Sequence, residues 1–116
     1  MKAILKNYRQ SPRKVRLVTD LIKGRSAATA SKKLDFVNKR ASRAVKKLID
    51  SALANAKEND STKKEDLYVK NITVDEGRTL YRIRARARGS AARIRKRTSN
   101  IVLTLDKKKK PKAKKK

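Results

Sequence analysis

The chain has 116 residues and a formal net charge of +26, from 36 Lys and Arg against 10 Asp and Glu. It contains no Cys, which excludes disulfides and thiolate catalysis, and no His, which removes the commonest general base and neutral metal ligand. No apolar run approaches the roughly 20 residues that cross a bilayer, and the start, MKAILKNYRQ, lacks the apolar core of a secretory signal. We therefore expect a single domain in the cytoplasm or an organelle matrix, with no metal or cofactor. The charge predicts an anionic partner, with nucleic acid the first candidate and an anionic membrane the second.

The first third of the chain predicts one extended segment and two helices. Residues 3–8 form the extended segment. Ser11 is the expected N-cap of the first helix, because Pro12 suits a first turn whose N–H groups have no partner, and Gly24 suits its C-terminal cap. The apolar side chains at helical spacing in this helix are Val15, Val18, Leu21 and Ile22. Ser26 is expected to start a second, shorter helix, whose weaker apolar face is Ala27, Ala30, Leu34 and Val37.

The third helix has the clearest periodicity, with apolar residues at i, i+3, i+4 and i+7 over four turns. These residues are Ala41, Ala44, Val45, Leu48, Ile49, Ala52, Leu53 and Ala56. The opposite face carries the basic residues Arg40, Arg43, Lys46 and Lys47. Such a face is either a solvated surface or a contact for an anionic partner.

The second half of the chain predicts strands. Residues 59–66 (NDSTKKED) form a polar loop, and residues 67–75 form a strand. The apolar side chains of this strand are Leu67, Val69, Ile72 and Val74. Residues 100–105 (NIVLTL) are β-branched and apolar and predict a returning strand. The final segment, 107–116, has no residues for a core, so we expect it to be disordered when free and to attract anions non-specifically.

Residues 82–97 (RIRARARGSAARIRKR) hold seven arginines and one lysine with no acid. The arginines alternate on both sides of a Gly-Ser pair, which predicts a β-hairpin with Gly89 and Ser90 in a two-residue turn. This register makes each arginine face another across the strand pair. The facing pairs are Arg86 with Arg93, Arg84 with Arg95, and Arg82 with Arg97.

Directly opposed like charges destabilise a strand pair, each by up to about 1 kcal/mol, and an isolated two-stranded ribbon is marginal in water. Phosphates between the guanidinium groups would remove this repulsion, because the planar arginine fork matches phosphate oxygens. The hairpin is therefore predicted to be an arm for a polyanion. The alternative is a disordered basic loop.

Basic residues occur on every segment, as expected for a protein surrounded by folded RNA rather than one that reads a single DNA groove. Only three Tyr and one Phe are present, so stacking platforms for splayed bases are not expected. The candidate RNA-contacting residues are Arg9, Arg13, Lys14, Arg16, Arg40, Arg43, Lys46, Lys47, Arg82, Arg84, Arg86, Arg88, Arg93, Arg95, Lys96 and Arg97.

Four blocks, in order, resemble the landmarks of the bacterial-type large-subunit ribosomal protein L-twenty-two family, over roughly residues 2–105. The blocks are SPRKVRLVTDLIKG, SALANAKEND, LYVKNITVDEG and RIRARARGSAARIRKRTSNI. The resemblance implies an α+β fold with three helices packed on a small antiparallel sheet. It also implies a long protruding basic β-hairpin at residues 75–100, within a single domain at residues 1–106.

The same resemblance implies a structural protein that binds large-subunit ribosomal RNA, aids subunit assembly, and contacts neighbouring large-subunit proteins. Its hairpin is expected to extend along the nascent-peptide exit tunnel. The expected tip residues, close to the nascent peptide, are Arg86, Ala87, Arg88, Gly89, Ser90 and Ala91. The chain departs from the family pattern at Ala85 (commonly Pro), at Ser90 (commonly Arg) and at Asn100 (commonly His).

Three other classes of protein fit the sequence less well. An enzyme is disfavoured because Asp75 and Glu76 are adjacent and point to opposite faces of a strand. A DNA-architectural protein also uses basic β-ribbon arms, but such arms carry an apolar wedge near the tip, which is absent here. A membrane-active cationic protein needs large aromatic anchors on a basic helix, and none of the predicted helices has them.

Overall fold

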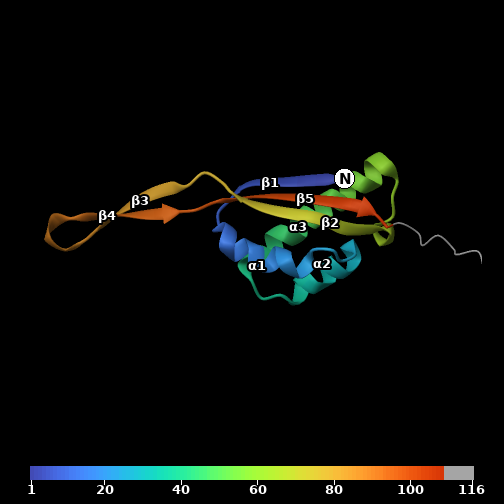
Figure 1. The fold of residues 1–116 in the computed structure, drawn as a ribbon, viewed down its shortest axis with the longest axis horizontal. Coiled ribbons are helices and arrows are strands. Elements are labelled where there is room, and N and C mark those ends of the chain that lie inside the picture. The colour runs from blue at the N-terminus through green and yellow to red at the C-terminus, as the bar shows by residue number, and fades with distance from the viewer. Residues whose placement is uncertain (109–116) are drawn as a thin grey trace, which may run out of the picture.

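Three helices pack on one face of a three-stranded antiparallel sheet, and a separate two-stranded sheet projects away from this body as an arm (Figure 1). The computed structural model describes residues 1–108, which extend over 80 × 26 × 23 Å. The elements in chain order are β1 (Lys2–Tyr8), α1 (Pro12–Ile22), α2 (Ala27–Phe36), α3 (Arg40–Asp60), β2 (Leu67–Glu76), β3 (Leu80–Ala85), β4 (Ala91–Lys96) and β5 (Ser99–Lys107). The predicted α+β class, with a protruding hairpin, is confirmed.

The start signals of α1 and α2 lie where the sequence predicts them. Pro12 occupies the first turn of α1, although the Ser11 side chain makes no capping hydrogen bond. Gly24 follows α1 with φ of 78°, a left-handed conformation that glycine adopts at low cost. At the start of α2 the Ser26 hydroxyl accepts a hydrogen bond of 3.3 Å from the backbone N–H of Thr29. Of the expected core residues, Leu21 is exposed and Val37 lies just beyond the end of α2.

Helix α3 is longer than its apolar pattern predicts. It continues to Asp60, so the first two residues of the expected polar loop are helical. It ends where Ser61 adopts a left-handed backbone (φ 48°), and residues Lys64–Asp66 then form a short 3₁₀ turn. The prediction of a loop over residues 59–66 is therefore wrong at its first two residues, because polar residues such as Asn59 continue an established helix at little cost.

Strand β5 is the central strand of the body sheet, with β1 and β2 antiparallel on either side. It extends beyond the predicted residues 100–105 at both ends and includes Lys107, the first residue of the predicted tail. Residues 109–116 of that tail lie outside the described residues. In β2, a register shift between Val69 and Asn71 changes the alternation, so that Leu67 and Val69 share the buried face with Ile72 and Val74.

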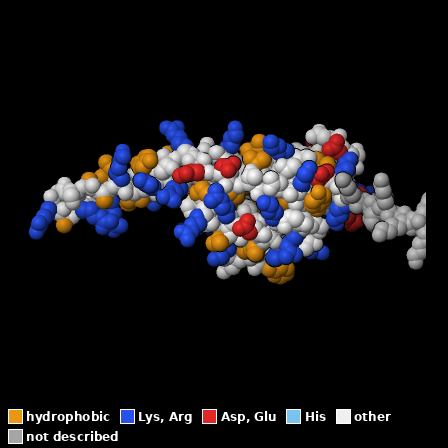
Figure 2. Space-filling view, in the orientation of Figure 1, with side chains coloured by type: hydrophobic (Ala, Val, Ile, Leu, Met, Phe, Trp, Pro, Cys, Tyr) orange, Lys and Arg blue, Asp and Glu red, His pale blue; other side chains and the backbone are white. Residues whose placement is uncertain are grey.

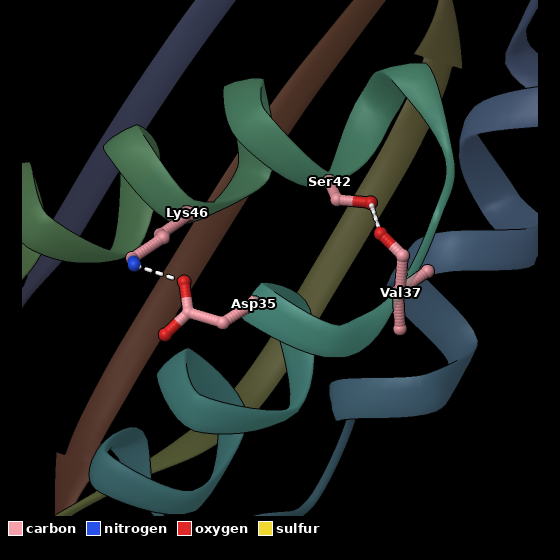
Figure 3. A network of polar contacts seen from close by, with 4 residues as sticks. All are labelled: Asp35, Val37, Ser42 and Lys46. Atoms are coloured by element: carbon pink, nitrogen blue, oxygen red, sulfur yellow. Dashed lines mark hydrogen bonds and ion pairs between the residues drawn. The ribbon is translucent and has the colours of Figure 1, made fainter.

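The core lies between this sheet face and the helices and is built from aliphatic side chains. The largest fully buried ones are Ile22, Ile49, Leu67, Ile101, Leu103 and Leu105. At the α2–α3 corner, the Ser42 hydroxyl donates a hydrogen bond of 2.9 Å to the carbonyl of Val37, and Lys46 forms an ion pair with Asp35 (Figure 3).

None of the helices within residues 1–108 has the length and apolar character needed to cross a membrane.

Candidate nucleic-acid interface

The arm joins the body through a short neck, in which Gly77 and Arg78 run alongside Thr98 and Ser99. The backbone N–H of Gly77 donates to the Thr98 carbonyl at 2.9 Å, and the Thr98 hydroxyl donates to the Arg78 carbonyl at 2.6 Å. The Ser99 hydroxyl donates to the Gln10 carbonyl at 2.6 Å, which links the neck to the segment after β1. A Cβ at position 77 would lie 2.6 Å from the Thr98 hydroxyl oxygen, so the neck requires glycine there.

The predicted pairing of the arm is wrong by three residues. Arg82 lies opposite Ile94, and Arg84 lies opposite Ala92. Each arginine that lies within β3 or β4 therefore faces an uncharged residue. This register avoids the direct arginine–arginine opposition that the sequence pattern suggested, and with it the repulsion expected for such pairs.

The register differs because the tip is a five-residue connection and not the two-residue Gly-Ser turn that we predicted. The pairing ends at Ala85 with Ala91, and residues 86–90 connect the strands. The backbone N–H of Arg86 donates to the Ser90 carbonyl at 2.8 Å, which closes this connection. Arg88 and Gly89 both have left-handed backbones, with φ of 60° and 72°. The predicted tip residues, 86–91, do lie at the end of the arm.

The basic side chains occupy both faces of the arm. Residues directly opposite each other share a face, and faces alternate along a strand. One face carries Leu80, Arg82, Arg84, Ala92, Ile94 and Lys96. The other carries Tyr81, Ile83, Ala85, Ala91, Arg93 and Arg95. The predicted register would have placed all of its paired arginines on one face, whereas the structure divides the arginines between both faces, so the arm can contact a polyanion on two sides.

An aromatic and a basic side chain are in contact across the two strands of the arm. The Arg93 guanidinium lies over the Tyr81 ring, 4.9 Å from its centroid, a cation–π contact. Ile83 is 77% exposed, so the arm has little core of its own. In Figure 2, Lys and Arg side chains lie along the arm and over the body.

Beside the neck, the arm and the body enclose a cleft of about 570 Å³, which we call the neck cleft. Its cationic lining residues are Arg9, Lys14, Arg40, Arg82, Arg95, Lys96 and Arg97. Gln10, Ser11, Leu80 and Thr98 complete the lining, and no Asp or Glu is among the described residues that form it. The Gln10 amide oxygen is buried and has no hydrogen-bond partner within residues 1–108. A larger hollow of about 770 Å³, beside Leu53 and Lys57, does not gather charge in this way.

On the body, two of the predicted RNA-contacting residues, Arg16 and Lys46, have partners within the protein. The Arg16 guanidinium donates a hydrogen bond of 2.9 Å to the Val74 carbonyl, so it ties α1 to β2. The hydrogen bond from Lys46 to Asp35, together with the nearby carboxylates of Asp35 and Asp50, raises the pKa of Lys46 above its usual range. The remaining body cations in the prediction, Arg13, Arg43 and Lys47, are exposed on α1 and α3.

The neck cleft brings together residues that are far apart in the sequence. Arg9 follows the end of β1 and Lys14 lies in the first turn of α1, whereas Arg40 begins α3 and Arg82 and Arg97 belong to the arm. The charge pattern of the sequence predicts each of these cations as a contact but does not predict that they converge. It gives no indication of Gln10 and Thr98 as lining residues, because neutral polar side chains carry no charge signal.

Residues 3–106 match the family described as ribosomal protein L22p/L17e. The chain is 50% identical to the large ribosomal subunit protein uL22 of Rubrobacter xylanophilus over 105 residues, which cover 90% of this chain and 83% of that protein. It is 47% identical to the uL22 protein of Halothermothrix orenii, covering 93% of this chain and 96% of that protein. It is 52% identical to the uL22 protein of Acetivibrio thermocellus, covering 90% of this chain and 83% of that protein.

Proposed function

This chain belongs to the ribosomal protein L22p/L17e family of structural, non-enzymatic ribosomal components, and from that premise we propose how it acts. It binds large-subunit ribosomal RNA through the arm, the neck cleft and the exposed cations Arg13, Arg43 and Lys47, and by this binding it aids assembly of the subunit. Neighbouring large-subunit proteins are further partners. The site of action is the cytoplasmic ribosome, with an organelle matrix as the alternative.

The observation that carries this proposal is the excess of unpaired positive charge on the arm and around its base. Within residues 1–108 there are two salt bridges, Lys46–Asp35 and Lys70–Asp106, and neither involves the arm or the neck cleft. The arginines of β3 and β4 are exposed, on an element with almost no core. Such an arrangement is stabilised by RNA phosphates, which accept paired hydrogen bonds from arginine and reduce the mutual repulsion of the cations.

The arm is proposed to extend along the nascent-peptide exit tunnel, with residues 86–91 close to the nascent peptide. Strands β3 and β4 have six residues each, so with the neck and tip the arm reaches on the order of 30 Å from the body. That length suits an element that inserts between RNA segments, with cations on both of its faces. The tip carries Arg86 and Arg88 but no large apolar side chain, which disfavours the alternative of a DNA-bending wedge.

The test is a competition binding experiment over a series of salt concentrations. The purified chain is given large-subunit ribosomal RNA in competition with random duplex DNA at equal phosphate concentration. We expect the preference for the RNA to persist from low to physiological salt, because recognition of folded RNA survives when counterion release contributes less. Equal loss of both affinities, with no remaining preference, would contradict the proposal and favour a DNA-architectural role.

A matched pair of variants makes the test specific to the arm. Arg82→Gln with Arg84→Gln removes two arm cations, whereas Lys32→Gln with Lys57→Gln removes the same charge from exposed positions outside the proposed interface. We expect the arm variant to lower the slope of log affinity against log salt by about 1 to 2, as expected for lost phosphate contacts. The control variant should keep the parent slope. An equal reduction of the slope in both variants would show that RNA binding depends on total charge and not on the position of the cations.

A further inference from the structure

We propose that backbone phosphates bind in the neck cleft between body and arm, and that this binding fixes the direction of the arm. The RNA identity of the ligand rests on the proposed function above. The existence of a phosphate site and its effect on the arm rest on the geometry of the cleft alone. Binding of the polyanion in the cleft therefore also orients the arm.

The cleft can couple the two parts because each part supplies cations to it. On the body side lie Arg9, Lys14 and Arg40, and on the arm side lie Arg82, Arg95, Lys96 and Arg97. An anion in the cleft contacts both sets. The volume of about 570 Å³ exceeds that of a single phosphate group several times, so successive phosphates of one backbone can enter.

Without an anion, the lining charges oppose the closed arrangement. None of the seven cations forms a salt bridge within residues 1–108, and no carboxylate lines the cleft. Like charges that lie closer than the Debye length, about 8 Å at physiological salt, are only partly screened from one another. The body and arm cations therefore push apart until a polyanion enters, and its phosphates reverse the sign of the interaction.

Two helix starts add to the positive potential. Ser11, at the start of α1, and Arg40, the first residue of α3, both line the cleft. Neither helix has an acidic residue in its first turn or a side-chain hydrogen bond at its N-cap. The dipoles of the two helices therefore add positive potential to that of the side chains.

The connection between body and arm leaves the direction of the arm relative to the body adjustable. The sheet β1-β5-β2 and the sheet β3-β4 are separate, so no continuous strand ladder holds the arm to the body. The link consists of two chain segments at the neck, with the hydrogen bonds of Gly77, Thr98 and Ser99. Such a short connection between rigid elements is typical of a hinge.

The test measures the distance between body and arm in the full chain. Since the sequence has no Cys, Ala54→Cys on α3 and Ala91→Cys on the arm provide two unique positions for spin labels, both exposed. Pulsed electron paramagnetic resonance then gives the distance distribution with no anion, with tripolyphosphate, and with a short RNA hairpin. Lys14→Gln with Arg40→Gln removes two body cations of the cleft, and Lys32→Gln with Lys57→Gln is the matched control.

We expect both anions to narrow the distribution of label-to-label distances in the parent and in the control variant. In the cleft variant, compared at equal RNA occupancy, we expect this narrowing to be lost. The cleft variant should also lower the slope of log affinity against log salt by about 1 to 2. Narrowing in the cleft variant equal to that of the parent would overturn the inference. So would an unchanged distribution in the parent with both anions, even if RNA binding itself is strong. If tripolyphosphate narrows the distribution but ribosomal RNA shows no preference over DNA, the cleft stands and the proposed function fails.

Discussion

Tyr81 and Arg93 lie on the same face of the arm and in contact across its two strands, with the guanidinium 4.9 Å from the ring centroid. Tyr81 is half exposed and is an aromatic residue placed among arginines, so the contact orders a ribbon that has almost no core. It also shows how the arm tolerates its charge, since a cation beside an aromatic face is stabilised while a cation beside another cation is not.

Tyr81→Ala is expected to loosen the arm without affecting the body. An exposed cation–π contact is worth about 0.5 to 1 kcal/mol, so amide hydrogen exchange in β3 and β4 should become roughly two- to fivefold faster. Exchange in α3 and β5 should not change. Tyr81→Phe keeps the ring and should behave as the parent; if it loosens the arm as much as the alanine variant does, the cation–π explanation is wrong.

Gly77→Ala is expected to destabilise the protein, because the added Cβ would lie 2.6 Å from the Thr98 hydroxyl oxygen. Overpacking of this kind costs about 1 to 3 kcal/mol, measured as the free energy of unfolding in urea. Thr98→Ala removes that oxygen together with its hydrogen bond to Arg78. The double variant should therefore be more stable than the sum of the two single effects predicts. Simple additivity would show that the clash is relieved elsewhere.

Arg16→Ala is expected to affect folding more than RNA binding. The Arg16 guanidinium donates to the Val74 carbonyl at 2.9 Å, and loss of this partly exposed hydrogen bond should cost about 0.5 to 1 kcal/mol of unfolding free energy. The salt slope of RNA binding should stay close to that of the parent. Arg84→Gln, on the exposed arm, should show the reverse. A large decrease of the salt slope in the Arg16 variant would show instead that Arg16 contacts RNA.

Asp106 is expected to make stability depend on acid pH. The backbone N–H of Lys107 and the ion pair with Lys70 lower the pKa of the Asp106 carboxyl below its usual range. A group with a lowered folded-state pKa stabilises the protein above its unfolded pKa, and this contribution is lost as the pH falls through the folded value. Asp106→Asn should therefore flatten the acid side of the urea midpoint plotted against pH. If the plot keeps its shape, the contacts of this exposed carboxylate do not contribute to stability.

Removal of residues 109–116 is expected to weaken RNA binding mainly at low salt. These eight residues include six lysines, and β5 stays intact because it ends at Lys107. Non-specific attraction depends steeply on salt, so affinity and salt slope should both fall, while the preference for ribosomal RNA over DNA should not change. An unchanged salt dependence would contradict this view of the tail. Loss of the preference for ribosomal RNA over DNA would show that the tail contributes to specific recognition.

The sequence by itself determined the helices, the strands, most of the core and the family. The apolar spacing of α3 and the Ser-Pro and Gly24 signals of α1 are local, so they can be recognised without the fold. The alternating arginines likewise predicted a hairpin arm. The four ordered blocks pointed to the family that the comparisons then showed.

Only the tertiary structure decided how the charges are arranged. The five-residue tip at 86–90 moved the arm register by three residues, and a single glycine in the sequence does not specify which turn position it occupies. Arg16 and Lys46 look like surface cations in the sequence, and their partners Val74 and Asp35 come close only on folding. The neck cleft is formed in the same way. Its cations are up to 88 positions apart, from Arg9 to Arg97, and the packing of α1, α3 and the arm brings them together.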